Sequence, residues 1–201
     1  MNFVVLASGR GGNLKAIIDA VKKGDIQADL KLVISNKEDA YALEHARQAG
    51  IPAVFINPKD FSDRESFDRA VIERLQEFKI DFVILAGYMR LLSSYFIQQY
   101  RDKILNIHPS LLPAFKGGHA IKEAFDHAVK VTGVTVHFVI DEMDAGAIIL
   151  QEIVRLDHSD TLESLEEKIH QVEHCIYPKA IELFTRGCLK IEGRKVTITK
   201  Q

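Results

Sequence analysis

Residues 1–18, MNFVVLASGRGGNLKAII, join a short apolar run to a glycine-rich loop and then to a helical pattern. The apolar run covers Phe3–Ala7, and the loop occupies residues 8–13. Behind the loop, apolar side chains recur at the spacing of one helix face, at Leu14, Ile17, Ile18 and Val21. A strand that passes through glycines into a helix is typical of the opening of a parallel α/β sheet.

Strand and helix patterns go on alternating through the first half of the chain. Ser62-Asp63-Arg64-Glu65 has the form of a capping box, which predicts a helix start at this point. Within the segment 81–86, the run from Phe82 to Ala86 is apolar throughout, as is typical of a strand buried on both faces. With the short connections between them, the patterns predict strands at 30–34, 53–56, 81–86 and 104–108, and a helix at 40–49. A second helix is expected behind the capping box, where Phe67, Val71, Leu75 and Phe78 keep helical spacing.

The pattern changes in the second half of the chain. After a helix expected over Ala120–Val129, two strand patterns follow at Gly133–Ile140 and Ala147–Leu156. The loop between them is short, so we expect the two strands to pair antiparallel. A long helix over Leu162–Phe184, interrupted by Pro178, and a small terminal hairpin complete the chain.

These patterns together predict an α/β fold. We expect an open mixed sheet with a parallel, Rossmann-like N-terminal half, antiparallel C-terminal strands, and helices on both faces. No linker rich in Pro, Gly or Ser divides the chain, so we expect a single domain over residues 1–201. A chain of this size, with 47% apolar residues, can fill a sizeable core.

Composition and charge exclude several classes of protein. The 26 basic and 28 acidic residues give a net charge of −2, which argues against a dedicated nucleic-acid binder. No apolar run has the length of a membrane-spanning helix, and no basic leader precedes the first apolar run. Two cysteines make neither a disulfide framework nor a metal site. We therefore expect a cytoplasmic protein that binds neither membrane nor nucleic acid.

The glycine loop has two interpretations. Gly11, Gly12 and Asn13 lie where a helix begins, and unpaired N–H groups at a helix N-terminus bind phosphate well. A tight turn from strand to helix would need the same glycines. The spacing lacks the third glycine of a dinucleotide site, and no lysine of the P-loop kind follows.

Asn106-Ile107-His108-Pro109 is the most specific stretch of the sequence. Asn106 and His108 are two residues apart on a strand, so both side chains project from the same face near its C-terminal end. An amide beside an imidazole suits stabilisation of an oxyanion together with proton transfer. The alternative is that Asn106 caps a turn and His108 is a hydrogen-bonded histidine of the core.

An acidic loop, Asp141-Glu142-Met143-Asp144, joins the two antiparallel strands. A carboxylate from this loop would stabilise His108 in its charged form, if the two lie close together. A solvated acidic turn is the alternative. The loop has no EF-hand pattern, and we expect no metal.

Other polar and apolar residues admit a binding role or an ordinary surface role. Arg64 could contact an anion, the 88–92 segment could line a pocket for a flat ring, and Glu173 could hold sugar hydroxyls. The alternatives are that Arg64 is an ordinary exposed residue, that the 88–92 segment packs at the start of a helix, and that Glu173 belongs to the solvated surface.

Taken together, these segments resemble the phosphoribosylglycinamide formyltransferase family of the formyltransferase superfamily. The resemblance covers essentially the whole chain. It rests on the motifs VVLASGRGGNL at 4–14, LAGYMR at 85–90, NIHPSLLP at 106–113, GVTVHF at 133–138, DEMDAG at 141–146, and Glu173-His174 with Ile176-Tyr177-Pro178.

The resemblance implies an enzyme that transfers the formyl group of 10-formyltetrahydrofolate to glycinamide ribonucleotide, as a monomer or homodimer and without a metal. It assigns Asn106, His108 and Asp144 to catalysis. It assigns the ribonucleotide to Gly11, Gly12, Asn13, His170 and Glu173. It assigns the folate to Arg64, Met89, Arg90, Leu91, Leu92, Ile140, Asp141, Glu142 and Met143.

Three positions depart from the family pattern. Gly12 stands where serine is common, so a hydroxyl contact with the phosphate is lost. Lys116 replaces an expected proline, and His170 replaces a polar amide. Three alternatives remain: a hydrolase that acts on the same folate, another formyltransferase of the superfamily, and a non-catalytic phosphate-binding α/β module.

Overall fold

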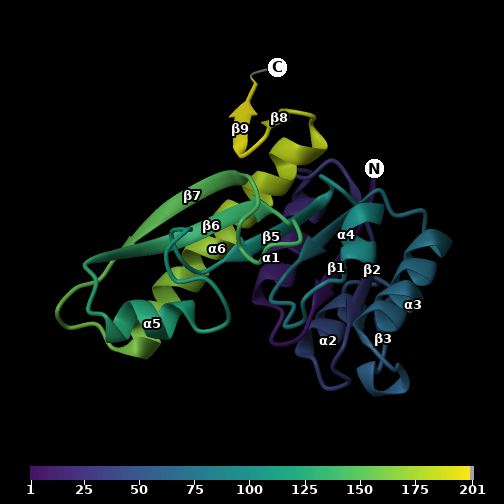
Figure 1. The fold of residues 1–201 in the computed structure, drawn as a ribbon, viewed down its shortest axis with the longest axis horizontal. Helices are drawn as coiled ribbons and strands as arrows, with labels where there is room; N and C mark the ends of the chain where they lie inside the picture. Colours follow the sequence, from purple (N-terminus) through teal and green to yellow (C-terminus); the bar gives the residue numbers. More distant parts are fainter. Residues whose placement is uncertain (200–201) are drawn as a thin grey trace. The chain divides into compact units, whose positions relative to one another are not determined.

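The computed structural model describes residues 1–199, and the chain divides after Leu105 into two compact units (Figure 1). The prediction that the whole chain forms one domain stays a prediction.

The first unit is built on parallel strands. β1 (Asn2–Ala7) lies between β2 (Asp29–Ser35) and β4 (Phe82–Leu85), and β3 (Ala53–Phe55) pairs with the outer side of β2. Residues 3–7 are completely buried, because helices cover both faces of the strand that carries them. Burial on both faces therefore explains why the sequences of β1 and β4 are continuously apolar, as expected.

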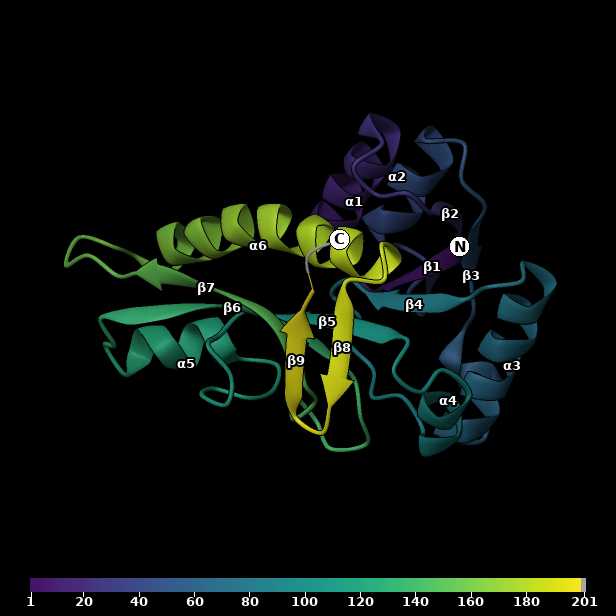
Figure 2. The same cartoon turned by 90° about the horizontal axis from the view of Figure 1, so that it is seen from above.

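Helices lie on both faces of these strands (Figure 2). α1 (Gly12–Lys23) and α2 (Tyr41–Gln48) contact each other on one face. α3 (Arg64–Glu77) and α4 (Ser94–Gln99) contact each other on the other face. The sequence patterns did not predict α4, a short helix that Ser93 caps through its side chain.

The predicted capping box of α3 is wrong by one position. Asp63, not Ser62, is the N-cap residue, and its carboxylate accepts the N–H of Ser66 at 2.7 Å. The Ser66 hydroxyl accepts the N–H of Asp63 in return. Aspartate competes well with serine at this position, so the residue with the better-placed oxygen begins the helix.

The second unit holds the antiparallel strands. β5 (Ile104–His108) leads the chain into it, and β6 (Val131–Phe138) pairs antiparallel with β7 (Ile148–Arg155), as expected. β6 begins and ends two residues before the predicted range. α5 (Ala120–Asp126) is shorter than predicted, because Ala128 takes a positive φ of 48° that a helix cannot continue. The mixed α/β class, parallel first and antiparallel later, is confirmed.

α6 (Leu162–Thr185) packs along β6 and β7. It starts with a capping box between Thr161 and Ser164 and continues through Pro178. It stops before Gly187, whose φ of +68° favours glycine. The terminal hairpin of β8 (Leu189–Glu192) and β9 (Lys195–Ile198) turns at Gly193, as predicted.

Gly146 closes the β6–β7 loop against the backbone of Phe138. A Cβ added at position 146 would lie 1.8 Å from the Phe138 carbonyl oxygen. Since this neighbour is backbone, it cannot move aside cheaply. The loop that carries Asp144 therefore depends on a glycine two residues later.

We predict that Gly146→Ala lowers the free energy of unfolding by roughly 1–3 kcal/mol, the usual cost of overpacking. Urea unfolding at neutral pH measures this. Gly118→Ala is the matched control, since its added Cβ meets nothing within 4 Å. Equal effects of the two substitutions would contradict the prediction.

Candidate active site

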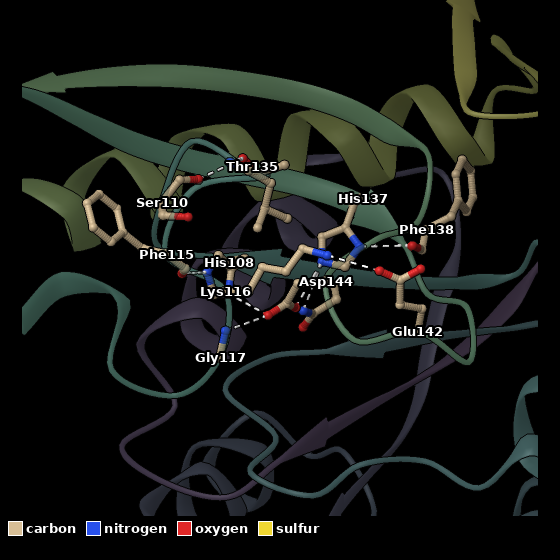
Figure 3. Close-up of polar contacts among 12 residues, drawn as sticks. His108, Ser110, Phe115, Lys116, Gly117, Thr135, His137, Phe138, Glu142 and Asp144 are labelled. Carbon is tan, nitrogen blue, oxygen red and sulfur yellow. Dashed lines mark hydrogen bonds and ion pairs between the residues drawn. The ribbon is translucent and has the colours of Figure 1, made fainter. Parts of the chain in front are cut away.

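His108 lies at the C-terminal end of β5 and is buried, with 5% of its surface exposed. Its Nε2 is 2.8 Å from the carbonyl oxygen of Phe115, and its Nδ1 is 3.5 Å from Oδ2 of Asp144 (Figure 3). A carbonyl oxygen only accepts, so Nε2 carries a proton. With oxygens facing both nitrogens, the ring can donate to both only in its protonated form.

Asp144 is the carboxylate that meets His108. It lies on the β6–β7 loop with a left-handed φ of 51°, an unusual conformation for a residue other than glycine. Its Oδ2 accepts the N–H of Gly117 at 2.9 Å. Burial alone would raise the pKa of Asp144, but the imidazole of His137, the Gly117 N–H and the charge of His108 together lower it to about 2. The carboxylate is therefore an anion at neutral pH.

His137 is a member of this cluster that sequence reasoning did not assign to the site. It lies on β6 with only 2% of its surface exposed. Its Nδ1 donates to the carbonyl oxygen of Phe138 at 2.8 Å. Its Nε2 is 3.2 Å from Nδ2 of Asn106 and 3.6 Å from Oδ1 of Asp144. A carbonyl oxygen only accepts, so Nδ1 carries a proton, while Nε2 lies between the Asn106 amide and the Asp144 carboxylate.

A hydroxyl network anchors the loop that follows β5. The Thr135 hydroxyl donates to the carbonyl oxygen of Ser110 at 2.7 Å and accepts the N–H of Leu112 at 3.1 Å. Gln151 donates from its amide to both Thr135 and the Leu112 carbonyl. Buried polar residues in otherwise apolar strands were the sequence signal for Thr135 and His137.

Lys116 gives the loop around Gly117 a second contact with the β6–β7 loop. Its Nζ is 3.2 Å from Oε1 of Glu142, so the lysine that replaces the expected proline forms an ion pair with the acidic loop. Ile140 and Met143 are exposed by 42% and 47%, and Asp141 is exposed as well. Apolar side chains open to solvent beside a buried charged pair are suited to contact an apolar ligand.

Glu173 of α6 is a second buried carboxylate, with 5% of its surface exposed. Its Oε2 is 2.9 Å from Nδ1 of His170, one helical turn earlier. The rings of His170 and His174 stack with centroids 6.5 Å apart. Burial lowers the pKa of His174 below its usual value, which Glu173 opposes. Of the residues predicted to bind the ribonucleotide, His170 and Glu173 lie in the second unit.

The glycine loop lies in the first unit. Gly11 is the N-cap of α1 with a φ of 79°, and a Cβ there would lie 2.8 Å from the Cα of Ala42. The Gly9 carbonyl accepts the N–H of Ala42 at 3.1 Å. Glycine is therefore required by the backbone, while the adjacent start of α1 at Gly12 and Asn13 keeps the geometry that suits an anion.

Two of the predicted folate residues of the first unit, Arg64 and Arg90, lie near a buried aspartate. Asp68, with 1% exposed, accepts the N–H of Ser93 at 2.6 Å. Burial raises its pKa, while the Ser93 N–H and the charges of Arg90 and Arg64 oppose the shift. The Arg90 guanidinium lies 4.3 Å above the ring of Phe67.

Met89 and Leu91 flank Arg90 and are exposed by 67% and 57%, whereas Leu92 is buried. Within residues 1–199, the Nε of Arg90 is buried without a hydrogen-bond partner. The segment 88–92 thus presents exposed apolar side chains next to Arg90, whose guanidinium is held over the Phe67 ring. Arg64 begins α3 and is exposed.

Over residues 1–199, no group of three or more His, Cys, Asp or Glu side chains could hold a metal ion. No helix in the same range is long and apolar enough to span a membrane. Cys175 and Cys188 are both free thiols.

We predict that Asp144 makes stability depend on acid pH. Folding lowers its pKa from an ordinary 3.8 to about 2. The carboxylate therefore stabilises the fold above pH 3.8, and this contribution of about 2 kcal/mol is lost as the pH falls toward 2. Urea unfolding of the wild type and Asp144→Asn should show a difference that shrinks over this range. A difference that stays constant would mean that Asp144 does not titrate as inferred.

Comparison with known proteins gives the family. The formyl transferase model matches residues 1–181, across the boundary of the two units. Phosphoribosylglycinamide formyltransferase of Escherichia coli is 44% identical over 95% of this chain and 90% of its own length. Glycinamide ribonucleotide transformylase 1 of Symbiobacterium toebii has 48% identity and a TM-score of 0.98, covering 100% of this chain and 94% of the solved one.

The human trifunctional purine biosynthetic protein adenosine-3 is 46% identical over 98% of this chain. The chain spans only 20% of that protein's length. The match to the family model and the nearly full-length relatives agree. The chain belongs to the formyl transferase family, among the phosphoribosylglycinamide formyltransferases.

Proposed function

We propose that this protein transfers the formyl group of 10-formyltetrahydrofolate to the amine of glycinamide ribonucleotide. The observation that carries the proposal is a network of contacts: the Asn106 amide and the Asp144 carboxylate both meet His137, and Asp144 also meets His108. An amide and a protonated imidazole are donors for an oxyanion, and acyl transfer forms one.

The reaction begins when the amine of the ribonucleotide attacks the formyl carbon. A C–N bond forms and the carbonyl oxygen becomes an oxyanion, which the positive charge of the His108 imidazolium and an N–H of the Asn106 amide stabilise. A preorganised group that stabilises an oxyanion contributes about 10²–10³ in rate. The contacts of His108 with Phe115 and Asp144 hold it in this way.

The tetrahedral intermediate then collapses with loss of the folate. The bond from the formyl carbon to N10 breaks, and one proton passes in net from the attacking amine to N10. Asp144 keeps His108 charged through this sequence, since a buried anion beside an imidazole favours imidazolium. Water carries the proton, and no covalent enzyme intermediate is required.

Two groups of residues would hold the ribonucleotide. The backbone N–H groups at Gly11, Gly12 and Asn13 would bind its phosphate, because the start of α1 is uncapped by a side chain. Glu173, supported by His170, would accept hydrogen bonds from ribose hydroxyls.

The folate would use apolar and cationic residues. The exposed apolar residues suit its ring system, and the arginines suit its glutamate tail. The proposed set is Arg64, Met89, Arg90, Leu91, Leu92, Ile140, Asp141, Glu142 and Met143. We place the reaction in the cytoplasm and propose no metal in it.

We predict that formyl transfer proceeds with the two substrates alone and survives chelation. Loss of 10-formyltetrahydrofolate followed spectroscopically, with and without glycinamide ribonucleotide, checks this. Consumption that needs the ribonucleotide, with unchanged rate in EDTA, is the expected result.

Release of formate without the ribonucleotide would show a hydrolase instead. Activity lost in EDTA and restored by a divalent ion would contradict the metal-free mechanism. Thermal stabilisation by the ribonucleotide but not by the folate would indicate a simple phosphate-binding module.

A further inference from the structure

The segment 86–93 joins β4 to α4 and forms neither helix nor strand (Figure 2). Backbone N–H groups in such a segment have no regular partners along the chain, so side chains from other elements can bind them. The segment includes residues 88–92, which are the ones proposed to contact the folate. The groups that hold its backbone therefore decide where those side chains lie.

Ser8 holds the first half of the segment. It follows β1 directly, and only 2% of its surface is exposed. Its hydroxyl donates to Oδ1 of Asn36 and accepts the N–H of Met89 at 2.8 Å. Because the single hydroxyl proton is directed at Asn36, a lone pair of the oxygen is left for Met89. The backbone N–H of Ser8 also donates to the Gly87 carbonyl oxygen at 3.1 Å.

Asp68 of α3 holds the other end of the segment, and the proposed reaction does not use this carboxylate. Asp68 is 1% exposed, and its Oδ2 accepts the N–H of Ser93 at 2.6 Å. The Ser93 hydroxyl in turn accepts the N–H of Phe96 and caps α4. The preceding residue, Phe67, is buried and carries the Arg90 guanidinium 4.3 Å above its ring. Two consecutive residues of α3 therefore hold the second half of the segment.

We propose that Ser8 and Asp68 are positioning residues for the folate, which fix both ends of the segment 88–92 and so set the affinity for the folate without touching it. The inference rests on the proposed function. Met89 and Leu91 are exposed by 67% and 57%, so core packing holds them little and the backbone anchors hold them more. A segment that is ordered beforehand loses less conformational entropy when its ligand binds.

Steady-state kinetics with each substrate varied in turn tests the proposal. Ser8→Ala and Asp68→Ala each leave a backbone N–H without its acceptor. Each should raise the KM for 10-formyltetrahydrofolate about tenfold, the usual scale for a buried hydrogen bond that loses one partner. Turnover at saturating folate and the KM for glycinamide ribonucleotide should stay unchanged, because neither variant alters a group proposed for chemistry or for the phosphate.

Asp68→Asn separates positioning from a general loss of structure. Its amide oxygen can still accept the Ser93 N–H, so the KM for the folate should return toward the wild-type value. Asn57→Ala is the matched control, since it removes a side chain that accepts the Lys59 N–H at 3.2 Å elsewhere in the first unit. It should change neither KM. If Asp68→Ala does not fold, as urea unfolding would show, Ser8→Ala and Asp68→Asn decide the outcome.

Calorimetric titration with tetrahydrofolate gives a second readout that needs no turnover. Binding should weaken about tenfold in Ser8→Ala and stay unchanged in Asn57→Ala. If Ser8→Ala binds as the wild type does while formyl transfer by the wild type proceeds, the positioning proposal alone is overturned. A ribonucleotide KM that rises as much as the folate KM, or an Asp68→Asn variant no better than Asp68→Ala, overturns it too. A wild type that binds no folate overturns it together with the function on which it rests.

Discussion

Asp144 is an anion held away from bulk water, and the arrangement of the second unit around it follows from the need to compensate that charge. A buried carboxylate is costly unless hydrogen bonds and opposite charges surround it. Three segments far apart in sequence meet this need: β5 with His108, the loop at Gly117, and β6 with His137. The same contacts that make the anion tolerable also orient the groups proposed for chemistry.

The residues around the Asp144 carboxylate hold one another in place. Phe115 and Asp144 both adopt left-handed backbone conformations, with φ near 50° in each. Such residues persist only where the surroundings fix them, and they cluster at functional sites. Here the Phe115 carbonyl holds one nitrogen of His108, and the Asp144 carboxylate faces the other. The left-handed backbone conformations of these two residues therefore go together with the position of the His108 ring.

The sequence predicted most of the fold because its signals were local. The apolar run of β1, the glycine turn at Gly11 and the helix stop at Gly187 each act within a few residues. Errors arose where two local signals compete, as at Ser62 and Asp63 for the start of α3, or where the signal is short, as at α4. The division after Leu105 has no linker composition that a reader of the sequence could notice.

The site was predicted less completely, since its members meet through tertiary structure. Asn106 and His108 stood out by strand spacing, and Asp144 came from resemblance to the family. His137 escaped assignment because a histidine inside an apolar strand looks like core, and only the fold shows it between Asn106 and Asp144. Thr135 escaped for the same reason, and the ion pair of Lys116 joins two loops that no local pattern connects.

The central claim is that His108 and Asp144 act as one unit in formyl transfer. A double-mutant cycle of turnover at saturating substrates, with His108→Ala, Asp144→Asn and the double variant, tests it most directly. Effects within a unit are not additive, so the double variant should be hardly slower than His108→Ala alone, which should lose ~10²–10³ in rate. If the two losses multiply fully in the double variant, Asp144 acts independently of His108 and the claim is wrong.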